Sequence, residues 1–258
     1  MTSGPAAAGA VAQVFVADVE KPVASADDLH HLVRVLRVRP GEAVVVADGA
    51  GAWRLCRLGE DRPGALVPQG DVQVEPGPAE AVTVGFVPVK GDRPEWVVHK
   101  LTELGVDRIV VLRAARSVVH WEGEREPKAM ERLGRVARAA SAQSRRVRLP
   151  TVQGVWSLHD MADGLAPDHL ALADRAGAAP AGGLRCLAVG PEGGWDPPER
   201  LGLPLVSLGR GVLRAETAAV AAGTLLCALR DGWSPPAGRQ WGSPEIAADR
   251  GVREAGFP

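Results

Sequence analysis

Two glycine-rich loops hold the residue types that could bind a ligand and act on it. The first loop follows an apolar run and reads Gly190-Pro191-Glu192-Gly193-Gly194. Glycines let a ligand approach the backbone closely and permit positive φ angles. Glu192 would repel a phosphate, and neither G-x-G-x-x-G nor G-K-[ST] is present. The loop therefore favours a neutral or cationic ligand held by backbone groups, with a tight turn that binds nothing as the alternative.

The second loop, over residues 208–217, adds a charged pair. Apolar residues follow a Gly-Arg-Gly turn, and Arg214 and Glu216 then lead into an expected helix. A guanidinium can stabilise negative charge that develops during a reaction, and a carboxylate can orient it or accept a proton. In the plainer alternative, Glu216 only favours the helix dipole and Arg214 is solvated. Two such loops at strand ends could form two walls of one pocket.

The elements around these loops predict an α/β domain. Strands are expected at 81–89, 108–112, 169–173, 185–190 and 205–209, and helices at 94–104, 127–144 and 216–230. Asp92 and Pro94 suit a helix start, and Asp196 with Glu199 predicts another start just after the first loop. Strands that alternate with helices indicate a parallel sheet covered by helices, and in such sheets ligands bind at the carboxyl ends of strands.

A smaller, mostly β unit precedes this domain. Short strands are expected at 12–19, 42–49, 52–58 and 71–76, with a helix at 27–37. Residues 75–80 resemble a linker because they combine proline, glycine and acids. We therefore predict domains at residues 1–76 and 77–232, followed by a loose tail at 233–258.

Composition limits the classes of function. The 258 residues carry a net charge of −1, so no overall field favours nucleic acid or membrane, and RNA binding would need a local basic patch. The three cysteines are far apart and form no C-x-x-C pair, which argues against a disulfide framework and against a metal site. Apolar runs are too short for a bilayer, and no basic segment precedes residues 6–17 as in a signal peptide. We expect a soluble, cytoplasmic protein.

Six motifs identify a family. They are HHLVRVLRVRPGE, KGDRPEWVVHKLTELGVDRI, RSVVHW, AQSRRVRLP, VGPEGGW and SLGRGVLRAETA, in order between residue 30 and about residue 226. With them the sequence resembles the RsmE family, the 16S ribosomal RNA (uracil(1498)-N3)-methyltransferases of the SPOUT class. The resemblance implies a small N-terminal PUA-like RNA-binding β-barrel and a C-terminal α/β methyltransferase domain with a trefoil knot. It also implies a homodimer that methylates 16S rRNA of the small ribosomal subunit.

The cofactor implied by this resemblance is S-adenosylmethionine, bound by the knot loops. This ligand carries a sulfonium and no phosphate, which agrees with the chemistry of the first loop. Trp195 is the tryptophan expected nearest to it. The predicted cofactor-binding residues are Leu172, Gly190, Pro191, Glu192, Gly193, Gly194, Leu208, Gly209, Val212, Leu213, Thr217 and Ala218.

The implied reaction transfers a methyl group to N3 of a uracil, which must lose its proton before or during attack. Arg214 is predicted to stabilise the anion at a uracil carbonyl, and Glu216 either to orient Arg214 or to accept the proton. The uracil must also leave any stack. The predicted RNA-binding residues are His31, Arg34, Arg37, Lys90, Arg93, Arg116, Arg146 and Arg148. The sequence departs from the family pattern at Ala115, Ala142 and Arg145.

Two other functions remain open at this point. One is a SPOUT enzyme that methylates a transfer RNA, whose knot loops would look similar. The other is a non-catalytic rRNA-binding or ribosome-assembly factor with a degenerate knot, against which the intact GPEGG and LRAETA motifs argue. A dinucleotide-dependent oxidoreductase is excluded by the missing G-x-G-x-x-G.

Overall fold

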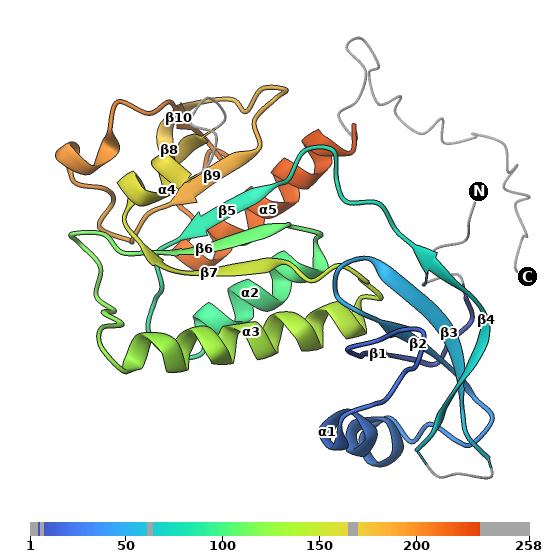
Figure 1. The fold of residues 1–258 in the computed structure, drawn as a ribbon. Coiled ribbons are helices and arrows are strands. Elements are labelled where there is room, and N and C mark those ends of the chain that lie inside the picture. Colours follow the sequence, from blue (N-terminus) through green and yellow to red (C-terminus); the bar gives the residue numbers. More distant parts are fainter. Residues whose placement is uncertain (1–4, 6–7, 61–63, 165–169, 233–258) are drawn as a thin grey trace, which may run out of the picture.

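The computed structural model describes residues 5, 8–60, 64–164 and 170–232. Two separate sheets lie side by side, a small one from the N-terminal residues and a larger one from the rest (Figure 1). The tail predicted at 233–258 lies outside the described residues. The expected combination of a small β unit and a parallel α/β domain is confirmed.

The N-terminal sheet has the order β1-β2-β3-β4, so every strand pairs with its neighbour in sequence. Its strands are β1 (Ala12–Phe15), β2 (Ala43–Ala47), β3 (Ala52–Leu58) and β4 (Leu66–Val74). β1 runs parallel to β2, and the other pairs are antiparallel. Val44, Val46 and Cys56 are fully buried and pack against Leu32, which comes from the connection between β1 and β2.

That connection differs from the single helix predicted at 27–37. It consists of α1 (Ala26–His30) followed by one π-helical turn, η2 (His31–Val35). Ser25 caps α1, because its hydroxyl accepts a hydrogen bond from the Asp28 N–H at 3.0 Å. Leu32 is buried in this segment, whereas Val33 and Val35 face solvent. A π-turn shifts the faces of a helix, which period-3.6 reasoning does not anticipate.

The larger sheet is parallel throughout and has the order β10-β8-β9-β5-β6-β7. Its strands are β5 (Thr83–Phe86), β6 (Arg108–Leu112), β7 (Thr151–Trp156), β8 (Leu170–Ala178), β9 (Cys186–Val189) and β10 (Leu205–Val206). All four residues of β5 and of β9 are buried, as expected for central strands covered on both faces. The strand expected at 205–209 is thus only two residues long, and β7 is a strand that the sequence did not predict.

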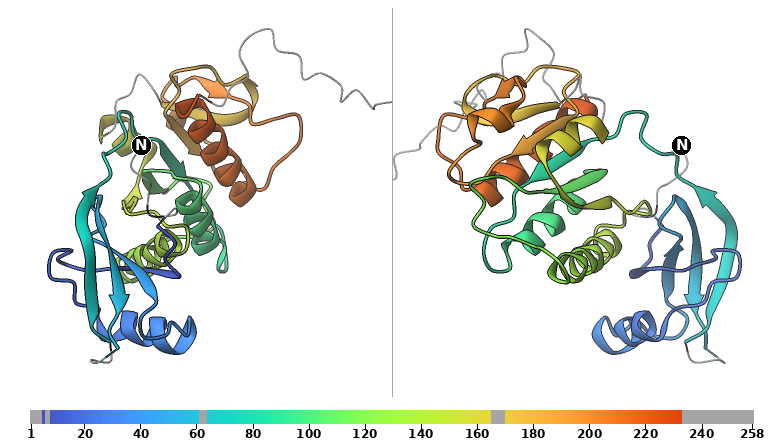
Figure 2. Two further views of the ribbon diagram at one scale, coloured as in Figure 1. Left: turned by 90° about the vertical axis from the view of Figure 1, so that its right-hand side faces the viewer. Right: turned by 60° about the vertical axis from the view of Figure 1, so that its left-hand side comes forward.

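Helices cover both faces of this sheet (Figure 2). One face packs on α2 (Arg93–Glu103), α3 (Arg125–Gln143) and α5 (Ala215–Arg230). The other packs on α4 (Leu158–Gly164), an unpredicted helix that contributes Leu158 and Met161. α5 approaches α2 closely at Gly223, where an added Cβ would lie 2.6 Å from Leu101 Cδ2. The helix expected after Asp196 is a single 3₁₀ turn, Pro197–Arg200.

Arginines from the end of α3 and the following loop join the two sheets. The Arg138 guanidinium donates to the Phe15 carbonyl oxygen at 2.9 Å and lies over the Phe15 ring. Arg145 donates to the Ala10 carbonyl oxygen at 3.0 Å, and Arg148 donates to the Glu75 carbonyl oxygen at 2.7 Å. Backbone carbonyls of the N-terminal part therefore hold this segment in place.

Candidate active site

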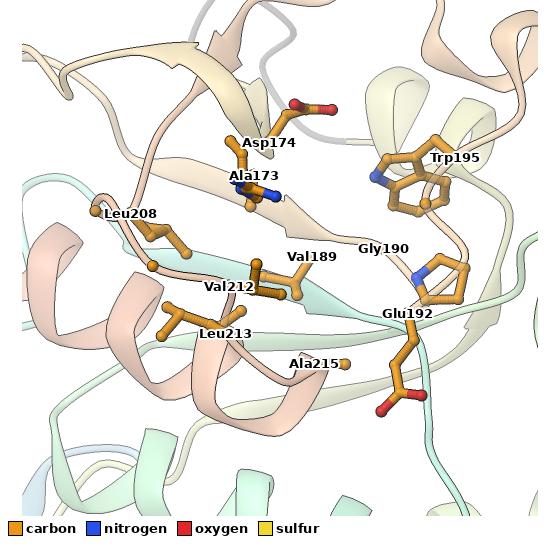
Figure 3. A pocket seen from close by; sticks show the side chains of 16 residues that line it. Ala173, Asp174, Val189, Gly190, Glu192, Trp195, Leu208, Val212, Leu213 and Ala215 are labelled. Carbon is orange, nitrogen blue, oxygen red and sulfur yellow. The ribbon is translucent and has the colours of Figure 1, made fainter.

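The two glycine loops meet at the carboxyl ends of β9 and β10 and enclose a pocket of about 250 Å³ (Figure 3). The middle of β8 closes one side with Ala173, Asp174 and Arg175, and α5 closes another with Ala215 and Ala218. The expectation that both loops wall a single pocket is therefore met by the geometry.

The first loop turns sharply after β9. Gly190 has no room for a side chain, since an added Cβ would lie 2.8 Å from the Trp195 indole nitrogen, and Gly194 has φ +71°. Pro191 and Glu192 also line the pocket. Trp195 is 3% exposed, and its indole N–H has no hydrogen-bond partner although it is buried. Figure 3 shows this nitrogen directed toward the pocket.

The first loop is fastened to the loop after β6. The Arg116 guanidinium donates to the Gly193 carbonyl oxygen at 2.8 Å and pairs with the Asp196 carboxylate at 2.6 Å. The Glu199 carboxylate accepts hydrogen bonds from the N–H groups of Ala115 at 2.8 Å and Asp196 at 3.1 Å. Arg116 thus holds the loop, whereas the sequence had suggested an RNA contact.

The second loop supplies an apolar wall. Gly209 has φ +137° and exchanges hydrogen bonds with the Ser207 hydroxyl, which closes the turn. Leu208, Val212 and Leu213 line the pocket, and Val212 is 76% exposed. This wall can contact the apolar parts of a ligand that enters from solvent.

Three of the twelve predicted cofactor residues do not line the pocket. Leu172 is fully buried in β8, Gly193 lies beneath Arg116, and Thr217 faces solvent on α5. The lining includes six residues outside the prediction, Ala173, Asp174, Arg175, Val189, Gly211 and Ala215, besides Trp195. The three residues of β8 were missed because nothing in the sequence of β8 or β10 indicates that these two strands pair.

Arg214 and Glu216 lie at the start of α5 but do not pair with each other. The Arg214 guanidinium is exposed and makes no hydrogen bond or ion pair within the described residues. The Glu216 carboxylate is 13% exposed, and its Oε1 lies 3.3 Å from an Arg93 guanidinium nitrogen. Its Oε2 is buried without a hydrogen-bond partner. The suggestion that Glu216 orients Arg214 is therefore wrong in this structure.

The predicted RNA-binding cations fall into two groups. His31, Arg34, Arg37 and Lys90 are exposed. The other four, Arg93, Arg116, Arg146 and Arg148, bind protein groups.

Arg146 is the most enclosed of these four. Its guanidinium donates to the Val106 carbonyl oxygen at 2.6 Å and pairs with the Asp107 carboxylate at 3.1 Å. Burial lowers the pKa of Arg146, and Asp107 opposes this shift. Only 13% of its side chain is exposed, and both terminal nitrogens of the guanidinium already contact protein oxygens.

The charges at the pocket are suited to a zwitterionic or cationic ligand. Asp174 and Glu192 contribute carboxylates, and Arg175 contributes one guanidinium. Among the described residues, no group of three potential metal ligands gathers anywhere. No helical stretch in the described ranges combines the length and apolarity that a bilayer crossing requires.

Comparison with known proteins defines the class. The RNA methyltransferase domain family matches residues 75–227, and the RNA methyltransferase PUA domain matches residues 25–67. A crystal structure from Porphyromonas gingivalis, 25% identical, superposes with a TM-score of 0.72 over 86% of this chain and 99% of that one. The C-terminal domain is therefore an RNA methyltransferase domain of the SPOUT class, and a PUA domain precedes it.

The particular family follows from closer relatives. Ribosomal RNA small subunit methyltransferase E of Mycobacterium bovis is 35% identical over 236 residues, which cover 83% of this chain and 89% of the relative. The enzyme of the same name from Neisseria gonorrhoeae, whose crystal structure holds S-adenosylmethionine, is 26% identical with a TM-score of 0.68, over 84% of this chain and 97% of that one. The chain belongs to the RsmE family.

Proposed function

We propose that this protein transfers a methyl group from S-adenosylmethionine to N3 of a uridine in 16S rRNA of the small ribosomal subunit, at the position that the family methylates. The observation that carries the proposal is the pocket at the ends of β9 and β10. It is formed by the loops that match the family's motifs, and the gonococcal relative binds S-adenosylmethionine.

The lining fits this ligand chemically. S-adenosylmethionine carries a sulfonium, an ammonium and a carboxylate, and the lining offers two carboxylates and one guanidinium in complement. The buried Trp195 N–H lacks a partner and suits a ligand acceptor, because an unpaired buried donor is costly. At Gly190 any side chain would collide with the Trp195 indole, so the glycine keeps this wall of the pocket in shape. Gly190, Pro191, Glu192, Gly194, Leu208, Gly209, Val212, Leu213 and Ala218 thus stay in the proposed site.

The side chains at the start of α5 suit the reaction. When bound, S-adenosylmethionine supplies a methyl carbon whose bond to sulfur breaks, with the electron pair left on sulfur, as N3 attacks. The free Arg214 guanidinium stabilises the negative charge on a uracil carbonyl, as preorganised donors do. The Glu216 carboxylate, with Oε2 unpartnered, accepts the N3 proton. Holding N3 in line with the methyl group supplies much of the rate.

The proposed RNA-binding surface keeps four of the eight residues that the sequence predicted. His31, Arg34 and Arg37 around η2, with Lys90 after β5, have side chains open to phosphates. Arg34→Ala should weaken binding of small-subunit RNA by no more than about 1 kcal/mol and reduce the slope of log K against log salt by about 1. Lys128→Ala, an exposed cation on α3 paired with Glu124, is the control and should leave the slope unchanged. An unchanged slope in Arg34→Ala would remove η2 from the surface.

We propose that the loops of residues 190–194 and 208–217 form the trefoil knot of the family and that two copies assemble as a homodimer. Neither a metal nor a membrane takes part. Assembly with small-subunit RNA would place the enzyme in the bacterial cytoplasm.

The experiment measures methyl transfer from radiolabelled S-adenosylmethionine, with the labelled nucleoside identified by mass spectrometry. The substrates are small ribosomal subunits that lack the modification, free 16S rRNA and bulk transfer RNA. We expect label in 3-methyluridine on the small subunit or its RNA. Label on transfer RNA would instead favour another SPOUT activity. No transfer to any of them, despite cofactor binding by calorimetry, would contradict the proposed substrate.

A further inference from the structure

We infer that Arg93 is a positioning residue that holds the Glu216 carboxylate at the active site, an inference that rests on the proposed function. The sequence places Arg93 among the RNA-binding cations, but the structure joins it to Glu216 at 3.3 Å. This contact links the start of α2 to the start of α5. It lies at the edge of the sheet where the glycine loops converge.

The packing of the two helices fixes where this pair can form. Arg93 is the first residue of α2, which follows the loop at the carboxyl end of β5, and Glu216 is the second residue of α5. The close approach of α5 to α2 at Gly223 sets the distance between the helices. In the chain, Glu216 directly follows Ala215, which lines the cofactor pocket.

Arg93 is the cation that holds this carboxylate. Oε1 of Glu216 faces Arg93, Oε2 is buried and accepts no hydrogen bond, and the described residues contain no other cation paired with Glu216. A carboxylate held by one contact reorients when that contact is lost. Side chains in a reacting geometry tolerate little displacement, and a shift of about 1 Å can cost 10²-fold in rate.

The Arg93–Glu216 pair explains why Glu216 and Arg214 can have separate roles at the start of α5. Because Arg93 neutralises Glu216, the neighbouring Arg214 guanidinium remains free for the substrate. Had Glu216 paired with Arg214, each would have blocked the other. Arg93 thus keeps an acceptor and an anion-stabilising donor separate although they are two residues apart.

The chain supplies a matched control in a second ion pair of α2. Arg132 of α3 pairs with Glu95 of α2, and one oxygen of Glu95 is likewise buried without a partner. Arg132 and Arg93 are similarly exposed, at 50% and 43% of the side chain. The Arg132 pair does not involve α5 or the pocket, so its loss reports the cost of breaking an inter-helix pair alone.

The test compares kcat and KM for RNA methylation, and the salt dependence of RNA binding, in Arg93→Ala, Arg93→Lys and Arg132→Ala. We expect Arg93→Ala to lower kcat by about 10- to 100-fold with KM for RNA and the salt slope unchanged. Arg93→Lys should recover part of kcat because it restores the cation, and Arg132→Ala should keep full kcat.

Three results would overturn the inference. Full kcat in Arg93→Ala with a salt slope reduced by about 1 would make Arg93 a phosphate contact. An equal loss of kcat in Arg132→Ala would mean that the loss in Arg93→Ala comes from weaker helix packing and not from Glu216. Full kcat in Glu216→Gln would show that the reaction does not need the carboxylate that Arg93 holds. Failure of the unaltered protein to transfer any methyl group would instead refute the proposed function itself.

Discussion

The junction between the sheets and the edge of the pocket use arginine in opposite ways. At the junction, Arg138, Arg145 and Arg148 donate to backbone carbonyl oxygens across the boundary. At the pocket edge, Arg175 and Arg214 are exposed and, within the described residues, pair with nothing. A guanidinium whose donors are occupied contributes to stability, and one whose donors are free can bind a substrate. Motif position alone does not separate these two uses.

The largest expected effect is the loss of stability in Arg146→Ala. The substitution leaves carbonyl oxygens and one side of Asp107 unpaired in a buried setting, although Arg230 still reaches Asp107 at 2.9 Å. We expect the free energy of unfolding to fall by about 3 kcal/mol. Urea unfolding measures this. Arg135→Ala breaks an exposed pair within α3 and should change stability by less than about 0.5 kcal/mol; equal losses would erase the distinction between the two kinds of arginine.

Arg214→Ala should show the opposite pattern. We expect kcat for methylation to fall by about 10²-fold or more, because a donor aimed at developing charge is lost. The free energy of unfolding should change by less than about 0.5 kcal/mol, since the side chain is exposed. Arg210→Ala removes an exposed arginine of the same loop that does not line the pocket, and it should retain kcat. A stability loss without a kcat loss would place Arg214 with the junction arginines.

Gly209→Ala tests whether backbone strain sets the shape of the second loop. Space exists for the methyl group, but φ +137° is unfavourable for alanine. We expect a loss of about 2 kcal/mol in the free energy of unfolding or, if the loop relaxes, in that of S-adenosylmethionine binding. Gly182→Ala is the control, because Gly182 has equal space, has no positive φ and does not line the pocket. Denaturation measures the free energy of unfolding of both variants, and calorimetry measures their binding of S-adenosylmethionine. Equal values in the two variants would contradict the role of φ.

The smallest effect concerns Cys227 near the junction. Burial raises the pKa of this thiol to about 11, with Arg230 opposing the shift. An unfolded thiol ionises near pH ~8.5, so the stabilisation is complete below that pH and is lost as pH rises toward the folded value. The free energy of unfolding should therefore fall between about pH 9 and 11, and fall less in Cys227→Ala. Urea unfolding of both proteins at pH 9 and pH 11 tests this. An equal fall in the free energy of unfolding with and without Cys227 would contradict the prediction.

Elements with a strong local signal could be predicted well. The strands at 52–58 and 108–112 were found with the observed bounds, and the ends of α2 and α5 were within one or two residues. β7 was missed because it contains Gln153 and Gly154 and is only partly buried at the edge of the sheet. The π-turn after His30 and the 3₁₀ turn at Pro197–Arg200 depend on tertiary contacts that no local pattern encodes.

The site could be predicted only in part for a similar reason. Glycine loops have a local signature, so both walls of the pocket were found. The third wall comes from β8, whose pairing with β10 is a long-range property. The partners of Arg93 and Arg146 likewise come from distant segments, Glu216 and Asp107. These pairs were not predicted, because a sequence shows which residue types are present and not which of them meet in space.

The strand order dictates when a growing chain can fold. The N-terminal sheet joins neighbours in sequence, so it can form as soon as β4 has left the ribosome. β5 cannot complete its pairing until β9 has been made, because Thr83 pairs with both Arg108 and Cys186. The pocket needs α5 as well. A nascent chain halted before residue 186 would therefore carry a folded first sheet and an unfinished second one, and catalysis could begin only after nearly the whole chain had been synthesised.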